Sequence, residues 1–242
     1  MSYHDLFIKW KSDVKDLNRS KFIQEILSEA EYPVLALNYS LHQRPFPVLP
    51  QSPYTKTRLT IKANFSQLLI DTEALSRFDL VTARPETEQD FHFCCIQGEV
   101  DIISLKLHER MQMKIKLNLV QEAIRRGIMF EVCYSKAIKD INARRIFIAN
   151  ASNLVKATKR KNIILSSQAA DLFEQRAPWD VINLACLLGL NIEEAHKTIV
   201  DNPAIALEHA RARKVFKSTV EVLDRDKFVG MYGESCLPLN NF

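Results

Sequence analysis

The stretch Ile128–Arg145 reads IMFEVCYSKAIKDINARR and changes its pattern halfway. Its first part, Ile128–Tyr134, follows Gly127 and is a mostly apolar run of β-branched and aromatic residues. Such a run is typical of a strand covered on both faces, as in a parallel sheet. Asp140 is then expected to cap a helix. The apolar positions of that helix recur at helical spacing, as Phe147, Ala151 and Leu154 and as Ile148, Ala151 and Val155.

Four cations lie between this strand and this helix: Lys136, Lys139, Arg144 and Arg145. In α/β folds the carboxyl ends of the strands are where ligands bind, so the loop predicts a site for an anion, and preferably for a polyanion. The structural alternative is an ion pair within the loop, in which Arg144 or Arg145 neutralises a carboxylate. The candidate carboxylates are Asp140 and Glu131.

Short apolar segments of this kind recur along the chain, and helical patterns separate most of them. Seven strands are expected, at Tyr3–Ile8, Val34–Asn38, Arg58–Ile61, Leu80–Ala83, Val100–Leu105, Met129–Tyr134 and Asn162–Ser167. Helices are expected at Ser20–Glu31 and around Asp71–Ser76, and the prolines of Gln43–Pro53 indicate an extended loop. Alternation of strands and helices predicts a parallel sheet with right-handed crossovers. Seven strands at this spacing favour a TIM-like barrel that is closed or nearly closed.

Only helical patterns follow the seventh strand. Pro178 fits the first position of a helix that ends at Gly189 in a Schellman motif. Asn191 and Glu194 form a possible capping pair for a second helix, and Asn202 and Pro203 are expected to start a third that runs to about residue 214. We therefore predict a single barrel domain with additional C-terminal helices over residues 1–214, and a tail or partner-docking segment over residues 215–242.

The net charge is only +4, but the basic residues are concentrated in one region. Residues 105–161 contain fourteen Lys and Arg against four Asp and Glu, so this region carries +10 and the remainder of the chain −6. Such asymmetry indicates a surface that faces a nucleic-acid backbone, although solvated helix faces explain the charge alone equally well.

Several other kinds of site have no support. The five glycines form neither GxGxxG nor GxxxxGK[ST], which excludes those nucleotide-binding loops. The six histidines contain no HxH or HExxH pattern, so no metal site is expected unless His4-Asp5 and His92 converge in space. The five cysteines include no CxxC pair, which favours reduced thiols in an intracellular protein. The first ten residues do not resemble a secretory signal, and no apolar run is long enough for a membrane helix.

The order Phe130-Glu131-x-x-Tyr134-Ser135-x-Ala137-Ile138-Lys139-Asp140-x-x-x-Arg144-Arg145 resembles the hallmark segment of the thirty-kilodalton protein subunit of ribonuclease P and RNase MRP. Further matching blocks are Arg58–Ile61, Asp79–Val81, Val100–Ile103, Arg126-Gly127, Ile163-Ile164-x-Ser166-Ser167, Arg176-x-Pro178-x-Asp180-Val181 and Leu188–Leu190. The resemblance covers roughly residues 1–214.

This resemblance implies a PHP-like α/β barrel of about seven strands that is not a nuclease by itself. Such subunits bind and brace a catalytic RNA that removes the 5′ leader of precursor tRNA. They do so together with a small ferredoxin-like subunit and further proteins, and more than one copy of the thirty-kilodalton subunit can enter the particle. The resemblance also implies rRNA processing through RNase MRP, a nuclear and nucleolar location, and no cofactor bound by this chain, since Mg²⁺ is expected at the RNA active site.

The resemblance also suggests which residues contact RNA. Its matching basic positions are Lys139, Arg144, Arg145 and Arg176, and Lys136 completes the predicted RNA-binding set. PHP enzymes hold metals with histidine and carboxylate clusters, and His4-Asp5 stands where they carry HxH, which agrees with a lost catalytic centre. Two rival functions remain open. One is a metal-dependent PHP-type phosphoesterase, and the other is a protein scaffold that docks through Trp179 and the C-terminal helices.

Overall fold

The computed structural model describes residues 3–9, 34–40, 55–62, 75, 77–170 and 172–215. Within these ranges seven strands form one sheet in the order β1 to β7, and every neighbouring pair is parallel. The strands are β1 (His4–Lys9), β2 (Val34–Ser40), β3 (Thr55–Lys62), β4 (Leu80–Arg84), β5 (Ile102–Ser104), β6 (Met129–Cys133) and β7 (Ile163–Ser166). All seven predicted strands are therefore confirmed, with ends that differ by up to three residues.

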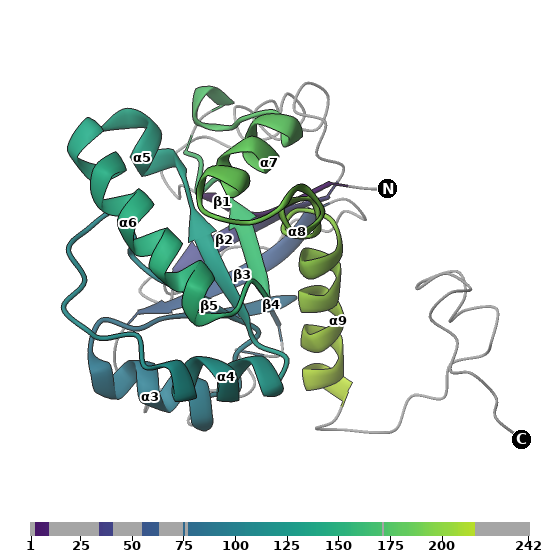
Figure 1. Ribbon diagram of the computed structural model, residues 1–242. Coiled ribbons are helices and arrows are strands. Elements are labelled where there is room, and N and C mark those ends of the chain that lie inside the picture. The colour runs from purple at the N-terminus through teal and green to yellow at the C-terminus, as the bar shows by residue number, and fades with distance from the viewer. Residues whose placement is uncertain are drawn as a thin grey trace, which may run out of the picture.

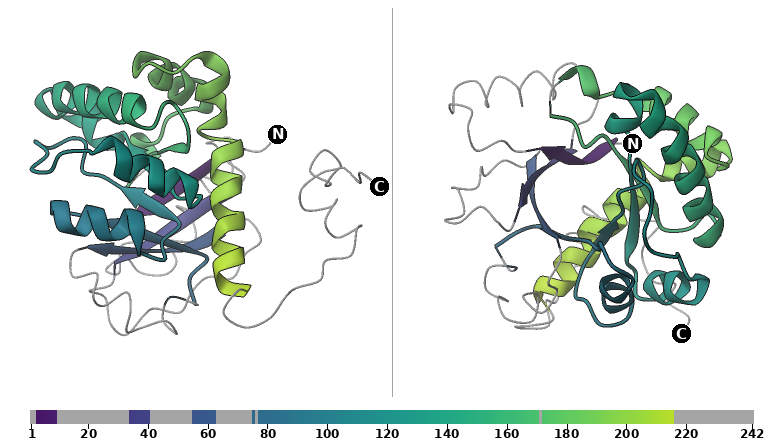
Figure 2. Two further views of the ribbon diagram at one scale, coloured as in Figure 1. Left: turned by 60° about the horizontal axis from the view of Figure 1, so that its bottom comes forward. Right: turned by 90° about the vertical axis from the view of Figure 1, so that its left-hand side faces the viewer.

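The sheet curls until its last strand lies beside its first, as the view along the ring of strands shows (Figure 2). An isolated parallel bridge joins Ile8 to Ala169, and the amide of Lys9 donates to the Ala169 carbonyl at 2.8 Å. Nearby, the amide of Ser167 donates to the carboxylate of Asp5 at 3.1 Å. The fold is thus a TIM-like, PHP-type barrel that is nearly closed, as predicted.

The helices lie outside the barrel or across one end of it (Figure 1). They are α3 (Glu88–Ile96), α4 (Leu117–Arg125), α5 (Ser135–Lys139), α6 (Ile141–Ala157), the 3₁₀ helix η2 (Leu172–Glu174), α7 (Pro178–Leu187), α8 (Ile192–Lys197) and α9 (Asp201–Val215). None of the helices in the described ranges has both the length and the apolar character needed to cross a lipid bilayer. The predicted helices at 20–31 and 71–76 and the proline-rich loop at 43–53 lie outside those ranges, apart from Leu75.

The ends of the helices follow local chemistry. The Asp140 side chain accepts from the Asn142 amide and caps α6, and Asn191 and Glu194 form a reciprocal capping box on α8. Gly189, at φ +107°, closes α7 with the two hydrogen bonds of a Schellman motif. These three predictions are confirmed. The predicted start of α9 is wrong by one residue, because the helix begins at Asp201 and the Asn202 side chain donates instead to the Ile163 carbonyl at 2.7 Å.

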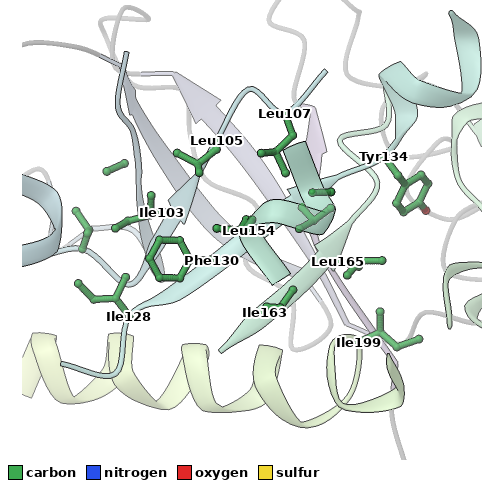
Figure 3. Packing of buried hydrophobic residues seen from close by; sticks show 14 of the residues in the cluster. Ile103, Leu105, Leu107, Ile128, Phe130, Tyr134, Leu154, Ile163, Leu165 and Ile199 are labelled. Atoms are coloured by element: carbon green, nitrogen blue, oxygen red, sulfur yellow. The ribbon is translucent and has the colours of Figure 1, made fainter. Parts of the chain in front are cut away.

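The larger apolar core fills the space between the outer face of the sheet and the surrounding helices. Figure 3 shows part of it, where Phe130, Ile163 and Leu165 of the strands lie with Leu154 of α6. The predicted buried face of α6 is confirmed at Phe147, Ala151, Leu154 and Val155. Ile148, which belongs to the same apolar pattern, is 42% exposed, because the stripe that faces the sheet is narrower than the pattern.

A second core closes the amino-terminal end of the barrel. It contains Leu6, Ala36, Leu80, Ile102, Met129 and Ile164 from the strands and Ala206 and Ala210 from α9. In the view along the barrel, α9 lies across the ring of strands (Figure 2). Asp101, which has no exposed surface, accepts from Arg213 at 3.1 Å and contacts the His209 ring at 2.9 Å. Because α9 blocks this end, any ligand that uses the barrel approaches from the carboxyl ends of the strands.

Candidate nucleic-acid interface

The loop after β6 contains a short helix that the sequence pattern did not reveal. The five-residue helix α5 follows Tyr134 directly, and Asp140, in an extended conformation, separates it from α6. The Ser135 amide donates to the Ser167 carbonyl at 3.0 Å, so α5 is attached to the end of β7. Lys136 and Lys139 thus lie on α5, whereas Arg144 and Arg145 lie near the start of α6.

All five predicted RNA-binding side chains are exposed or partly exposed: Lys136, Lys139, Arg144, Arg145 and Arg176. They come from two neighbouring segments, the α5–α6 loop after β6 and the loop after β7, which are tied to each other by hydrogen bonds. The structure therefore gathers them at the carboxyl end of the barrel. Whether they contact RNA stays a prediction.

Arg144 contacts backbone carbonyls and not the carboxylates considered from the sequence. Its Nε donates to the Ala137 carbonyl at 2.8 Å and its Nη2 to the Ile138 carbonyl at 2.9 Å. These two bonds occupy carbonyls at the end of α5, which have no partner within so short a helix. The alternative in which Arg144 pairs with Glu131 is excluded, because Glu131 binds another arginine inside the barrel.

Lys139 and Arg176 are held by the segment after β7. Lys139 forms an ion pair with Glu174, whose side chain is only 5% exposed. Burial acts to raise the pKa of Glu174, but the hydrogen bond and charge of Lys139 hold it below its usual range. Arg176 donates through Nη1 to the carbonyls of Phe173 and Gln175, and its amide donates to the Tyr134 hydroxyl at 3.3 Å.

Two further basic groups, which sequence reasoning missed, lie within electrostatic reach of this loop. Burial lowers the pKa of Lys9 at the end of β1. The charge of Glu174 opposes this effect, and the charges of Lys136 and Lys139 lower the pKa further. Burial likewise lowers the pKa of His108, with added repulsion from Lys136 and Arg84. Lys9 ends a strand at the ligand-bearing face, which is the signal that could have identified it.

The centre of the barrel is occupied by a buried ion pair. Arg58 on β3 and Glu131 on β6, both 0% exposed, form two hydrogen bonds at 2.5 and 2.7 Å. Arg58 also donates to the Leu6 carbonyl at 2.7 Å. Burial acts to raise the pKa of Glu131, but the Arg58 charge and the hydrogen bonds that the carboxylate accepts together outweigh it, and the pKa lies below its usual range. Arg58 and Glu131 both belong to blocks singled out in the sequence, yet nothing local indicated their pairing.

A second guanidinium lies on the next strand. Arg84 donates to the Ser104 hydroxyl at 3.0 Å, and its Cζ lies 5.3 Å from the centre of the Phe7 ring. The Cζ of Arg58 lies 4.1 Å from the centre of the same ring. Phe7 is thus within cation–π distance of two arginines. Of these two guanidinium groups, that of Arg58 pairs with the Glu131 carboxylate, and that of Arg84 has no carboxylate partner among the described residues.

A third buried group, Asp5, connects β1 to the segments after β7. Its Oδ1 accepts from the amides of Phe7 and Ser167, and its Oδ2 accepts from the Gln175 side chain at 3.2 Å. Burial raises the pKa of Asp5 to about 6, against the lowering effect of the Ser167 and Phe7 hydrogen bonds. Asp5 therefore has a structural task in closing the barrel.

Metal-ligating groups are not gathered in the part of the chain that the structure describes. No group of three His, Cys, Asp or Glu side chains there is placed to hold a metal ion. Cys94, Cys95 and Cys133 are buried free thiols, and Cys186 is an exposed one. Burial raises the pKa of Cys133 far above its usual value, so this thiol stays protonated at neutral pH.

These observations define a class: a PHP-type barrel with an arginine–glutamate pair at its centre and exposed cations around its carboxyl end. Residues 2–215 match the family model described as RNase P subunit p30. The chain belongs to the RNase P subunit p30 family.

Curated relatives agree with this assignment. The chain is 30% identical over 223 residues to the probable ribonuclease P protein subunit 3 of Schizosaccharomyces pombe, covering 87% of this chain and 94% of that protein. It is 36% identical over 162 residues to the mouse ribonuclease P protein subunit p30, covering 65% of this chain. It is 38% identical over 175 residues to the Arabidopsis thaliana protein GAMETOPHYTE DEFECTIVE 1, covering 70% of this chain. The matches span only 60% of the mouse protein and 30% of the Arabidopsis protein.

Solved structures share the fold. A chain of an archaeal ribonuclease P with mature tRNA superposes with a TM-score of 0.65 at 14% identity, covering 92% of this chain and 99% of that one. The Aspergillus niger ochratoxinase superposes with a TM-score of 0.55 at 9% identity, covering 85% of this chain and 71% of that one. At such low identity these likenesses concern the barrel and not its activity.

Proposed function

We propose that this chain is a non-catalytic protein subunit of ribonuclease P, and of RNase MRP, that binds and stabilises the catalytic RNA. The observation that carries the proposal is the cluster of five solvent-accessible cations at the carboxyl end of the barrel, in a chain of the RNase P subunit p30 family. Phosphates of a folded RNA are the natural partners of such a cluster. The reaction served would be removal of the 5′ leader of precursor tRNA, and rRNA processing through RNase MRP.

The lack of catalysis by the chain itself is supported by the barrel interior. A catalytic divalent cation needs carboxylate, imidazole or thiolate ligands, and nearby positive charge disfavours its binding. In this barrel Glu131 is already neutralised by Arg58, and Arg84 adds a further positive charge. We therefore expect Mg²⁺ to act on the RNA and not on this chain.

The remaining elements of the proposal rest on family membership. We expect a small ferredoxin-like protein and further subunits as partners, with more than one copy of this chain possible per particle, and a nuclear and nucleolar location. Trp179, 56% exposed at the start of α7, remains the candidate anchor for a protein partner.

Salt dependence of RNA binding tests the proposal. Lys136→Ala with Arg145→Ala removes two exposed cations, whereas Arg144→Ala would also break the two bonds that hold α5. Removal of each cation that neutralises a phosphate should flatten the plot of log affinity against log salt by about 0.7 to 0.9. The matched control is Lys156→Ala with Lys161→Ala, at or beyond the other end of α6, which should change little.

An unchanged slope in the first double variant, with native circular dichroism, would contradict the assignment of these residues. Sequencing of the RNA that co-purifies with the tagged chain would identify the partner directly. Conversely, hydrolysis of a generic phosphoester with Mn²⁺ or Zn²⁺ that disappears when His4 or His92 is mutated would establish a PHP phosphoesterase instead.

A further inference from the structure

Arg84 is a buried cation without a compensating anion among the described residues. Arg84 is 6% exposed, and within the described ranges it forms no ion pair with a carboxylate. Its Nε has no hydrogen-bond partner there either. Its polar neighbours are neutral: Ser104, and the Gln168 amide, whose oxygen, when turned toward Arg84, lies 3.1 Å from Nη1 and 3.3 Å from Nη2. A buried charge with only neutral partners is costly, so its presence indicates an anion that the described residues do not supply.

The other buried arginine in the described part of the barrel, Arg58, has a carboxylate partner. It lies near the same Phe7 ring and is fully neutralised by the two oxygens of Glu131. Cys133 lies close to this pair, with its Sγ 3.7 Å from the Ser104 hydroxyl and 3.4 Å from Glu131 Oε2. Because that thiol stays protonated, it contributes no negative charge. The buried carboxylate of Asp5 is bound by the Phe7 and Ser167 amides and by Gln175, so Arg84 has no direct carboxylate partner among the described residues.

Several basic groups lie around the mouth of the barrel. Lys9, half-buried at the end of β1, makes no hydrogen bond or ion pair through its side chain among the described residues. Lys136 lies within electrostatic reach of both Lys9 and His108, and Arg84 within reach of His108. The acids nearby already have partners: Glu174 binds Lys139, Glu109 contacts His108 at 3.2 Å, and Glu86 binds Lys106 at 2.6 Å. The charge of Glu174 also acts on Lys9. The four basic groups that converge here are Lys9, Arg84, His108 and Lys136.

We propose that the carboxyl-end mouth of the barrel is a binding site for a phosphate group, with Arg84 as its buried donor and Lys9 and Lys136 as its rim. A phosphate offers several acceptor oxygens, which suit a guanidinium and two ammonium groups at once. The site lies where barrel folds generally bind phosphate, at the carboxyl ends of the strands. This proposal goes beyond the proposed function, because the site is defined by its own charges whether the phosphate belongs to a polynucleotide or to a small molecule.

Calorimetric titration of the full chain with inorganic phosphate, against chloride at equal ionic strength, tests the site. We expect measurable phosphate binding that Lys9→Gln and Arg84→Gln each weaken at least about tenfold, the loss expected for one charge-assisted hydrogen bond. Arg84→Lys keeps the charge and should retain most of the affinity, which separates loss of the site from loss of the fold. Lys161→Gln, beyond the far end of α6, is the control and should bind phosphate as the wild type does.

A second arm measures binding of ribonuclease P RNA to the same variants. Weaker binding of both ligands would assign the mouth to a phosphate of the polynucleotide, and weaker binding of inorganic phosphate alone would assign it to a small phosphorylated molecule. Either result supports the site. If the wild type binds phosphate but no RNA, the proposed function fails and the site stands. The site is refuted if the wild type shows no phosphate binding and the RNA affinity of both Gln variants equals that of the wild type.

Discussion

The buried pair of Arg58 and Glu131 is expected to dominate the stability of the barrel centre. Replacement of Glu131 by Gln keeps the shape of the side chain but removes its charge. Arg58 then remains inside the barrel with the Leu6 carbonyl and the Phe7 ring as its other neighbours, and neither carries a negative charge. Loss of one partner from a fully buried ion pair costs about 3 to 5 kcal/mol. Because domains of this kind are stable by about 5 to 15 kcal/mol, the single change should be severe.

The double variant Arg58→Met with Glu131→Leu removes both charges and should be far less harmful. Apolar replacement of a buried pair is often neutral, and the main loss here is the hydrogen bond to the Leu6 carbonyl, worth about 1 kcal/mol. We therefore expect the double variant to lie within about 2 kcal/mol of the wild type, with strongly non-additive single effects.

Urea denaturation at about pH 7.5 with a common m-value measures the wild type, Glu131→Gln, the single variants Arg58→Met and Glu131→Leu, and the double variant. The reasoning would be refuted if Glu131→Gln cost less than about 1 kcal/mol, which is the scale of an ordinary neutral hydrogen bond. It would equally be refuted if the effects of Arg58→Met and Glu131→Leu simply added in the double variant, because the pair would then carry no coupling.

Three further predictions concern other parts of the fold. Asp5 has a pKa of about 6 in the folded chain against its usual value of 3.8, so the folded state binds more protons between these pH values. Its contribution to stability is full below pH 3.8 and is lost, by about 3 kcal/mol, as the pH rises through 6. Asp5→Asn should remove this pH dependence in urea titrations from about pH 4 to 8. Gly189→Ala should cost about 1 kcal/mol through its φ of +107° alone. Gly127→Ala should cost more, because its φ is +81° and the added Cβ would lie 3.1 Å from the His209 ring. Equal losses in thermal melts would contradict this ranking. Asp101→Asn should weaken the attachment of α9 and speed amide hydrogen exchange in that helix, and unchanged exchange there would show that the apolar contacts of α9 suffice.

Much of the fold could be predicted because it depends on neighbours in the sequence. The seven strands, the Asp140 cap, the Gly189 closure and the Asn191–Glu194 capping box all follow from patterns a few residues long. The pattern alone did not decide burial where three-dimensional packing intervened. Ile148 has the spacing of a buried residue but lies at the edge of the stripe that meets the sheet.

The candidate site was predicted only in outline. The cations after β6 were evident from composition and position, and the structure places them on the expected face. Their contacts were not evident: Arg144 holds the end of α5, and Lys139 binds a glutamate 35 residues away in the sequence. Contacts of this range depend on how two loops meet above the barrel, which no local pattern encodes.

The sequence by itself determined the alternation of strands and helices, the ends of several helices and the position of the basic loop, because these depend on propensities and hydrogen bonds between near neighbours. Only the tertiary structure decided that Arg58 neutralises Glu131, 73 residues away, and that Arg84 lies beside them without a carboxylate among the described residues. The physical reason is that the closure and register of the barrel choose which inward-facing charges meet, and an isolated charge becomes costly only once the fold has buried it.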